Sequence, residues 1–252
     1  MSGLFRGLLP EPVAVVETAE DVADPGLFPE EAERVAAAVD ERRREFGTVR
    51  YCARAALAGL GGPRVPLLPG ERGAPRWPDG FVGTMTHCRG YRAAAVARTA
   101  DMDGVGMDVE PNEPLRDSGV LNLIALPEER AALPGLAARR PDVAWDRLIF
   151  SAKESVYKVW FPLTRKWLDF EEAVIEPDPD AGTFRARLLV PGPVVNGVRL
   201  GGFTGRWDVR DGLVGTAIGL VRERAAGSAA GDASPPDGPD GGRGSVAGAV
   251  PS

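Results

Sequence analysis

The sequence predicts an α+β fold for most of the chain. Some stretches carry apolar residues at helical spacing and others alternate apolar and polar residues, without the regular strand–helix order of α/β proteins. With 252 residues, of which 44% are hydrophobic, the chain can bury a core in one large domain or two small ones. Residues 222–252 are rich in Gly, Ala, Pro and Ser and lack aromatic residues, so we predict a disordered tail there.

The first half of the chain is predicted to mix helices and strands. Pro29 suits a first helical turn, and Gly47 is expected to separate two helical stretches, the second of which ends at Gly59. We expect, in order, a strand at 13–16, helical stretches from 29 towards 44 and from 48 to 59, a Pro/Gly-rich loop at 63–83, and strands near 84–87, 91–98 and 105–110.

The second half is predicted to contain one strong helix and four strands. The helix covers 145–161 and is bounded by Pro141 and Pro162. Asp211-Gly212 is a two-residue hairpin signal between apolar segments. We expect the strands at 173–176, 183–190, 206–210 and 213–220.

The composition excludes several classes of protein. A net charge of −6 argues against a general nucleic-acid binder, and no run approaches the roughly eighteen apolar residues of a membrane span. Pro10 and Pro12 interrupt any signal-peptide core, and Cys52 and Cys88 form no disulfide framework, so we predict a cytoplasmic protein. There is no Walker loop or Gly-x-Gly-x-x-Gly motif, which argues against P-loop enzymes and Rossmann dehydrogenases.

The segment 104–111 carries the clearest chemical signal. On a strand, Asp108 and Glu110 face the same side, about 7 Å apart, while the apolar residues between them face the core. Gly106, on the side of the carboxylates, is expected to leave room for a ligand near the backbone. Two carboxylates here suit Mg²⁺, which prefers carboxylate, water and phosphate oxygens. The alternative is an ordinary solvated strand face.

The helix 145–161 adds a second group of charged residues. Glu154 and Lys158 lie one turn apart, opposite the apolar stripe, and Lys153 lies at its border. Aromatic residues share the charged side, which favours a surface covered by a ligand or a second domain. A carboxylate with adjacent lysines suits a metal-bound phosphate, although an i,i+4 surface ion pair is the simpler alternative.

His87 is the single histidine of the chain. A zinc site with Cys52 and Cys88 is an alternative, but the ligand spacing typical of zinc is absent. With Thr86 beside it and Arg89 before a glycine turn, His87 is better suited to binding an anion.

Arginines gather in the helical region 42–54. On an ideal helix Arg43, Arg50 and Arg54 share one flank of the apolar stripe. They form either a solvated face partnered by glutamates or a cationic patch that holds a polyphosphate.

Four segments, taken in order, resemble the 4′-phosphopantetheinyl transferases of the Sfp/EntD type, in their actinobacterial branch. The similarity extends over most of residues 10–220. The matching segments are an arginine block at 43–50, Thr-Met-Thr-His at 84–87, Val-Gly-Met-Asp-Val-Glu at 105–110 and Phe-Ser-Ala-Lys-Glu-Ser-Val-Tyr-Lys at 150–158.

The resemblance implies a fold and an activity. The fold would be a pseudo-dimer of two similar α+β halves, 1–112 and 113–221, with the active site between them. The enzyme would transfer phosphopantetheine from coenzyme A to a serine of apo acyl or peptidyl carrier proteins of fatty-acid, polyketide, non-ribosomal peptide or siderophore synthases, releasing adenosine 3′,5′-bisphosphate. We expect a monomer without nucleic-acid or membrane partners. The alternatives are a catalytically silent coenzyme A- or carrier-binding module, and another Mg²⁺-dependent phosphoryl enzyme.

The resemblance also assigns roles to individual residues. Asp108, Glu110 and Glu154 would bind Mg²⁺, with Mn²⁺ as an alternative ion, and Glu154 or a metal-bound water would deprotonate the carrier serine. The expected contacts to coenzyme A are Lys153 and Lys158 on phosphate oxygens, His87 with Arg42 or Arg50 on the 3′-phosphate, Thr86 in the histidine segment, and Arg72 in place of a lysine of the 63–83 loop.

Overall fold

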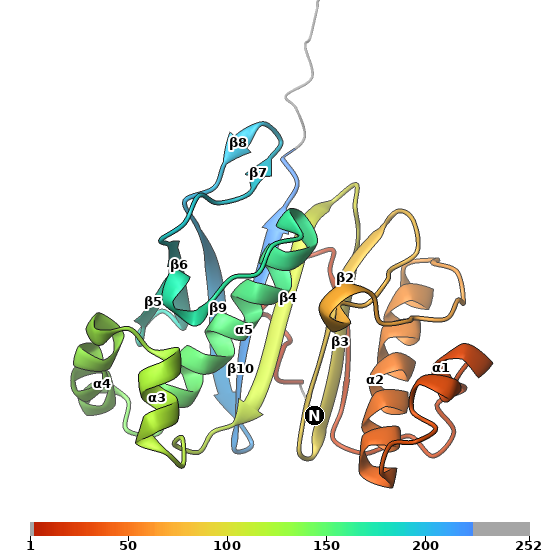
Figure 1. Ribbon diagram of the computed structural model, residues 1–252, viewed down its shortest axis with the longest axis horizontal. Coiled ribbons are helices and arrows are strands. Elements are labelled where there is room, and N and C mark those ends of the chain that lie inside the picture. The colour runs from red at the N-terminus through yellow and green to blue at the C-terminus, as the bar shows by residue number, and fades with distance from the viewer. Residues whose placement is uncertain (1–2, 224–252) are drawn as a thin grey trace, which may run out of the picture. The chain divides into compact units, whose positions relative to one another are not determined.

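Two antiparallel sheets, each covered by a 20-residue helix, form the architecture in this computed structural model (Figure 1). Residues 3–223 are described, and those up to Arg222 form one compact unit. The predicted α+β class is therefore confirmed. Apart from residues 222 and 223, the predicted disordered tail lies outside the described residues.

The N-terminal sheet has three strands in the order β1-β3-β2. Helix α2 covers one face of it and packs Cys52 and Leu57 against Ala94 and Val96 of the central strand. The elements are β1 (Ala14–Thr18), α1 (Pro29–Arg34), α2 (Asp40–Gly59), the short 3₁₀ helix η1 (Glu71–Gly73), β2 (Phe81–Cys88) and β3 (Tyr91–Arg98).

The first helical region differs from the prediction in one respect. Helix α1 ends at Arg34 and α2 begins at Asp40, so the interruption lies before Gly47 and not at it. A Cβ at Gly47 would lie 2.7 Å from Pro25. This glycine therefore permits the preceding loop to approach the helix closely, and it does not break the helix.

The larger sheet has five strands in the order β4-β10-β9-β6-β5, and a separate ribbon pairs β7 with β8. The predicted hairpin at Asp211-Gly212 joins β9 to β10. The elements are β4 (Met102–Pro111), α3 (Ser118–Ile124), α4 (Pro127–Arg139), α5 (Trp145–Thr164), η2 (Phe170–Glu172), β5 (Ala173–Asp178), β6 (Thr183–Leu188), β7 (Val194–Val195), β8 (Val198–Arg199), β9 (Gly202–Arg210) and β10 (Leu213–Val221).

The helices of this half differ from the prediction in two respects. Helices α3 and α4 lack a distinct apolar stripe in the sequence, so periodicity did not identify them. Helix α5 continues past Pro162 to Thr164, because a proline in the final turn forfeits few helical hydrogen bonds.

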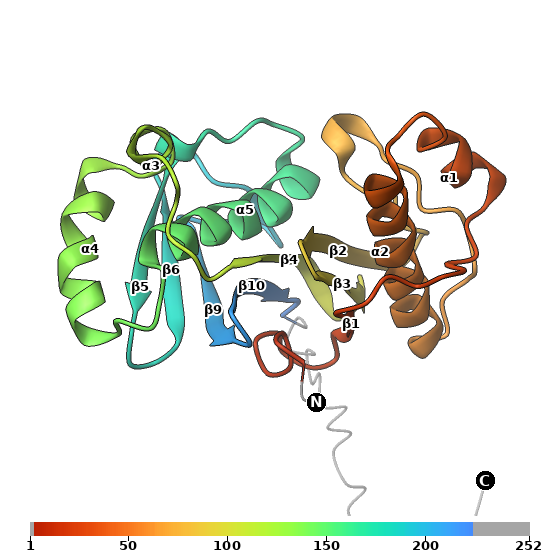
Figure 2. The same ribbon diagram turned by 90° about the horizontal axis from the view of Figure 1, so that it is seen from below.

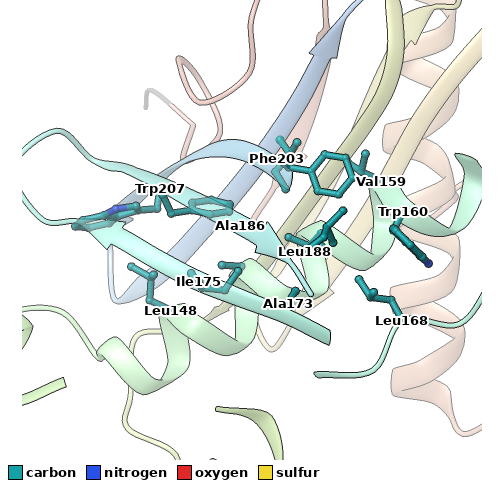
Figure 3. Packing of buried hydrophobic residues seen from close by; sticks show 14 of the residues in the cluster. Leu148, Val159, Trp160, Leu168, Ala173, Ile175, Ala186, Leu188, Phe203 and Trp207 are labelled. Carbon is teal, nitrogen blue, oxygen red and sulfur yellow. The ribbon is translucent and has the colours of Figure 1, made fainter. Parts of the chain in front are cut away.

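The main core lies between α5 and the large sheet. Figure 3 shows Leu148, Val159 and Trp160 of α5 among side chains from β5, β6 and β9, including Phe203 and Trp207. The predicted apolar stripe of α5 is confirmed, because each of its members is at most 3% exposed: Trp145, Ile149, Ala152, Val156 and Trp160.

The strand β4 connects the two sheets. It hydrogen-bonds to β10 in the large sheet, and its apolar face packs with alanines of β3 and with Leu4 and Phe5 of the N-terminal segment. Figure 2 shows that segment on one side of β4 and β10 and α5 on the other. The division into halves at 112/113 and their pseudo-dimeric relation stay predictions, although β4 itself lies in the sheet of the second half. No helix within residues 3–223 is long and apolar enough to cross a membrane.

Candidate active site

Close packing of α5 on β4 brings the two signature segments together. A Cβ at Gly106 would clash with the Ser155 carbonyl oxygen and lie 2.6 Å from Val159 Cγ2. Gly106 therefore makes room for the helix, so the expectation that it makes room for a ligand is wrong. The carboxylates of β4 consequently lie next to the charged side of α5.

Asp108 is the centre of this junction and is 5% exposed. Its Oδ1 accepts a hydrogen bond from Lys158 Nζ at 2.7 Å and another from the Thr86 hydroxyl at 3.1 Å. The same hydroxyl accepts a bond from the backbone N–H of Val109 at 3.2 Å, which ties β2 to β4. Asp108 Oδ2 is buried and has no hydrogen-bond partner within residues 3–223.

Glu110 lies beside Asp108 in a crowded anionic environment. Burial, and then the charge of Asp108, raise the pKa of Glu110 to about 7. Arg147 of α5 opposes this effect, because its Nη1 lies 3.2 Å from Glu110 Oε2. The arginine also binds the Glu113 carbonyl oxygen, which holds the segment after β4 against the start of α5.

Glu154 is half-buried on α5. Burial raises its pKa, and Lys158 partly offsets that effect. Glu154 lies at the edge of a mostly apolar cavity of about 160 Å³, whose walls include Tyr157, Trp167 and Phe170. The carboxylate accepts no hydrogen bond from any described residue, so both its oxygens are available to a bound group.

Arg72, in the loop between α2 and β2, lies against Trp167, one of the residues that line this cavity. Its Cζ lies 5.1 Å from the centre of the Trp167 ring, an arrangement typical of a cation–π contact. The Trp167 side chain forms a second aromatic contact with Tyr157 at 5.2 Å. A basic group from the N-terminal half thus lies at the rim of a cavity formed by the C-terminal half.

His87 and Arg42 form the next basic group. Arg42 Nη1 lies 2.7 Å from His87 Nε2, and Glu45 Oε2 lies 3.6 Å from His87 Nδ1. An arginine can only donate hydrogen bonds, so His87 Nε2 carries no proton and accepts this one, and the imidazole is neutral. Burial lowers the pKa of His87, Glu45 raises it, and Arg42, Lys158 and Arg92 lower it further.

The helical-wheel choice of Arg43 as a member of the basic patch is wrong. Arg43 binds the carbonyl oxygens of Ala36 and Ala38 and the carboxylate of Asp40, at the start of α2. Arg42 is the residue that reaches His87. A helical wheel describes only the positions of residues around α2. It does not include the preceding loop, whose carbonyl groups accept the hydrogen bonds of the Arg43 guanidinium.

Comparisons with known proteins assign the family. A family model described as 4′-phosphopantetheinyl transferase N-terminal domain matches residues 30–97, and one for the 4′-phosphopantetheinyl transferase superfamily matches residues 104–195. The chain is 67% identical over 195 residues to 4′-phosphopantetheinyl transferase Svp of Streptomyces mobaraensis, which covers 77% of this chain and 79% of that protein. This chain belongs to the 4′-phosphopantetheinyl transferases.

Two further transferases show the same relation. PptT of Mycobacterium tuberculosis is 49% identical over 202 residues, and the aligned region covers 78% of this chain and 88% of PptT. Npt of Nocardia iowensis is 46% identical over 225 residues, and the aligned region covers 85% of this chain and 99% of Npt. The predicted family, its actinobacterial branch and the enzyme class are therefore confirmed. As a member, the chain is an enzyme of coenzyme A-dependent phosphopantetheine transfer to carrier proteins.

Two predicted phosphate ligands of the transferase have other partners. Lys153 is 4% exposed, and its Nζ pairs with Glu129 at 2.8 Å. Arg50 is 6% exposed, stacks on Phe46 and donates to the Leu67 carbonyl oxygen at 2.9 Å. The expected contacts of these two cations with coenzyme A do not fit this arrangement, because both charged groups are enclosed and hydrogen-bonded within the protein.

Sequence reasoning missed Arg147, and it missed the contact of Glu45 with His87, in the transferase site. Arg147 binds Glu110, and Glu45 faces both His87 and Arg42. The sequence partly indicated both residues, because Glu45 lies within the arginine block and Arg147 lies one helical turn before the signature segment of α5. Glu110 and His87 lie on other elements, however, so the sequence carried no signal that would select these two contacts.

The residues at the junction fit a hard divalent cation. Asp108 has a buried, unpartnered oxygen, and Glu110 and Glu154 supply further carboxylate oxygens. Within residues 3–223, no three His, Cys, Asp or Glu side chains are already grouped closely enough to hold a metal ion. The zinc alternative at His87 does not fit the structure, since Cys52 is fully buried in the core between α2 and β3.

Proposed function

We propose that the transferase moves 4′-phosphopantetheine from coenzyme A to a carrier-protein serine with Mg²⁺ held by Asp108, Glu110 and Glu154. The observation that carries this proposal is the environment of Asp108, where Lys158 binds one oxygen and the other is buried without a partner. When bound, Mg²⁺, or Mn²⁺ as an alternative, neutralises charge on the pyrophosphate and polarises the phosphorus under attack.

Atoms balance in a single displacement. The serine Oγ bonds to the phosphorus that carries pantetheine, and the bond from that phosphorus to the bridging oxygen breaks. The products are the phosphopantetheinyl serine and adenosine 3′,5′-bisphosphate. Glu154 receives the serine proton, a role that its raised pKa and its free oxygens support.

Lys158 and Thr86 prepare the site for this reaction. The Lys158 side chain is 25% exposed, so its ammonium can bind a phosphate oxygen while it remains beside Asp108. A positive charge there stabilises the charge that develops on the leaving group. The Thr86 hydroxyl orients the Asp108 carboxylate from β2.

His87 and Arg42 are proposed to bind the 3′-phosphate of coenzyme A. The Arg42 side chain is 50% exposed and that of His87 is 33% exposed, so both can reach a ligand. Glu45 stabilises a proton on the imidazole when an anion arrives. A guanidinium and an imidazolium together match a phosphate dianion in charge and in hydrogen-bond donors.

The cavity beside Glu154 is proposed to accept the pantetheine arm. Its walls are mostly apolar, and Glu154, a proposed ligand of Mg²⁺, lies at its edge. Arg72, at the rim on Trp167, is placed to contact the phosphate end of the arm. This order of phosphate and apolar sites matches the order of groups along coenzyme A.

The remaining proposals concern where and on what the enzyme acts. We propose a cytoplasmic monomer that modifies carrier proteins of fatty-acid, polyketide, non-ribosomal peptide or siderophore synthases and that has no nucleic-acid or membrane partner. The acidic composition and the two unpaired cysteines, Cys52 and Cys88, support this view.

The test is Asp108→Asn in a transfer assay with coenzyme A, Mg²⁺ and several apo carrier proteins, read as a mass gain of the carriers. We expect turnover to fall by about 10²–10³-fold. Asp103→Asn is the matched control, because Asp103 is another buried carboxylate of β4, paired with Arg222. Equal turnover in the two variants would refute the metal assignment, and no mass gain with the parent protein would favour a silent coenzyme A-binding module.

A further inference from the structure

The signature lysine Lys153 belongs to a buried cluster centred on Glu129. Glu129 is 2% exposed, and its Oε2 accepts hydrogen bonds from Lys153 Nζ at 2.8 Å and from the Leu126 N–H at 2.6 Å. Its Oε1 accepts a bond from the Ile175 N–H at 2.6 Å. Lys153 Nζ also donates to the Phe170 carbonyl oxygen at 2.7 Å. The pair thus joins α4, α5, η2 and β5 at one point.

The N-terminal half contains the same arrangement around Glu31. Glu31 is fully buried, accepts the Phe28 N–H at 3.0 Å and the Leu67 N–H at 2.7 Å, and pairs with Arg54 of α2 at 2.9 Å. Arg54 donates in turn to the Pro25 carbonyl oxygen at 2.8 Å.

The two clusters also correspond in sequence. Each begins with an apolar residue followed by Pro-Glu-Glu, and the second glutamate is the buried one: Phe28-Pro29-Glu30-Glu31 and Leu126-Pro127-Glu128-Glu129. The cation follows its glutamate by 23 residues in the first cluster and by 24 in the second. One arrangement therefore fastens a long helix to the start of a short one in both halves.

The N-terminal cluster shows what such a pair does when neither of its members belongs to a signature segment. Arg54 holds α2 to the α1 region and to the 63–80 loop through Glu31. By the same geometry, Lys153 holds α5 to η2, whose Phe170 forms a wall of the cavity beside Glu154. Lys153 itself lines this cavity, but its ammonium is held by Glu129 and the Phe170 carbonyl oxygen, so it is not free to bind a phosphate.

We propose that Lys153 is a positioning residue: through Glu129 and the Phe170 carbonyl it sets the cavity wall and the turn of α5 that carries Glu154, and it does not contact coenzyme A phosphates. The proposal rests on the proposed function of Glu154 and its cavity.

Kinetics of three variants test the proposal: Lys153→Met, Glu129→Gln and the double variant. If Lys153 acts through Glu129, both single variants lower kcat by a similar factor, about tenfold, and the double variant is no worse than the poorer single one. Lys153→Arg should recover part of the loss, since Arg54 serves in the equivalent place. The proposal would be overturned if Lys153→Met raised the KM for coenzyme A while Glu129→Gln kept the kinetics of the parent.

The N-terminal pair supplies the matched control. Glu31→Gln and Arg54→Met remove an equally buried ion pair that is not adjacent to the cavity. These variants should lower Tm as the C-terminal ones do, while kcat at saturating coenzyme A stays within about twofold of the parent. If they reduce kcat as much as Lys153→Met does, the C-terminal effect is general destabilisation and the proposal fails.

A labelling experiment gives an answer even if a variant does not fold. The chain has three lysines, so acetylation of the native protein can be read residue by residue by mass spectrometry. Lys166 is exposed and should react fully, whereas Lys153 should react at least about tenfold more slowly, with or without coenzyme A. Rapid labelling of Lys153 that coenzyme A suppresses would overturn the proposal. The labelling of Lys153 does not depend on turnover, so it separates this proposal from the metal assignment at Asp108.

Discussion

Replacing Gly106 by alanine would place a methyl group 2.6 Å from Val159 Cγ2 and closer still to the Ser155 carbonyl oxygen. Real Cβ atoms do not approach other heavy atoms within 3.0 Å, so α5 would have to move away from β4 by more than 0.4 Å, the difference between 3.0 Å and 2.6 Å. Overpacking of this kind costs about 1–3 kcal/mol of unfolding free energy. For a domain of this size, that loss lowers Tm by about 2–12 °C.

The same movement would disturb the chemistry of the site. Lys158 lies one turn beyond Ser155 on α5, and its 2.7 Å bond to Asp108 joins the two displaced elements. We therefore expect Gly106→Ala to reduce turnover even at temperatures where the variant is folded.

Gly104→Ala is the matched control for this prediction. Gly104 lies on the same side of β4, but its added Cβ would meet Val159 Cγ1 at 3.3 Å, a contact that a small side-chain adjustment relieves. Thermal and denaturant unfolding of the two variants, followed by the transfer assay below both Tm values, make the comparison. If Gly106→Ala is as stable as Gly104→Ala, the packing argument is refuted. A stable Gly106→Ala variant with reduced coenzyme A affinity would instead restore the idea that this glycine makes room for a ligand.

Two further predictions concern side chains at the junction. Thr86→Val should lower the unfolding free energy by about 1–3 kcal/mol, because it leaves the Val109 N–H without an acceptor and removes a hydrogen-bond donor from Asp108. Thr86→Ser should retain both hydrogen bonds. Equal stability of the two variants in urea would contradict this prediction. Burial lowers the pKa of His87 below 6.5, so below pH 6.5 the unfolded chain binds more protons than the folded one, and the unfolding free energy decreases as the pH is lowered. His87→Gln should weaken that dependence between pH 6.5 and 5, and identical pH profiles of the unfolding free energy would rule out this role of His87.

Local patterns in the sequence predicted much of this transferase. The strand at 91–98 was predicted with the bounds that β3 has, and the Asp211-Gly212 hairpin and the buried stripe of α5 were confirmed. Alternation along 104–111 also assigned Val105, Met107 and Val109 correctly to one core-facing side of β4, because side-chain direction in a strand depends only on position along the chain. The order of the four signature segments identified the family.

Partners from other elements could not be predicted in this way. Periodicity describes which residues share a face, but not which group from elsewhere lies against that face. Gly106 faces a helix backbone, Arg43 binds the loop before its own helix, and Lys153 pairs with a glutamate 24 residues earlier in the chain. The sequence by itself therefore determined the family, the main elements and the position of the carboxylates of β4. Only the tertiary structure decided which cations remain free for a ligand, because burial and hydrogen bonding of a charged group depend on the packing of whole elements.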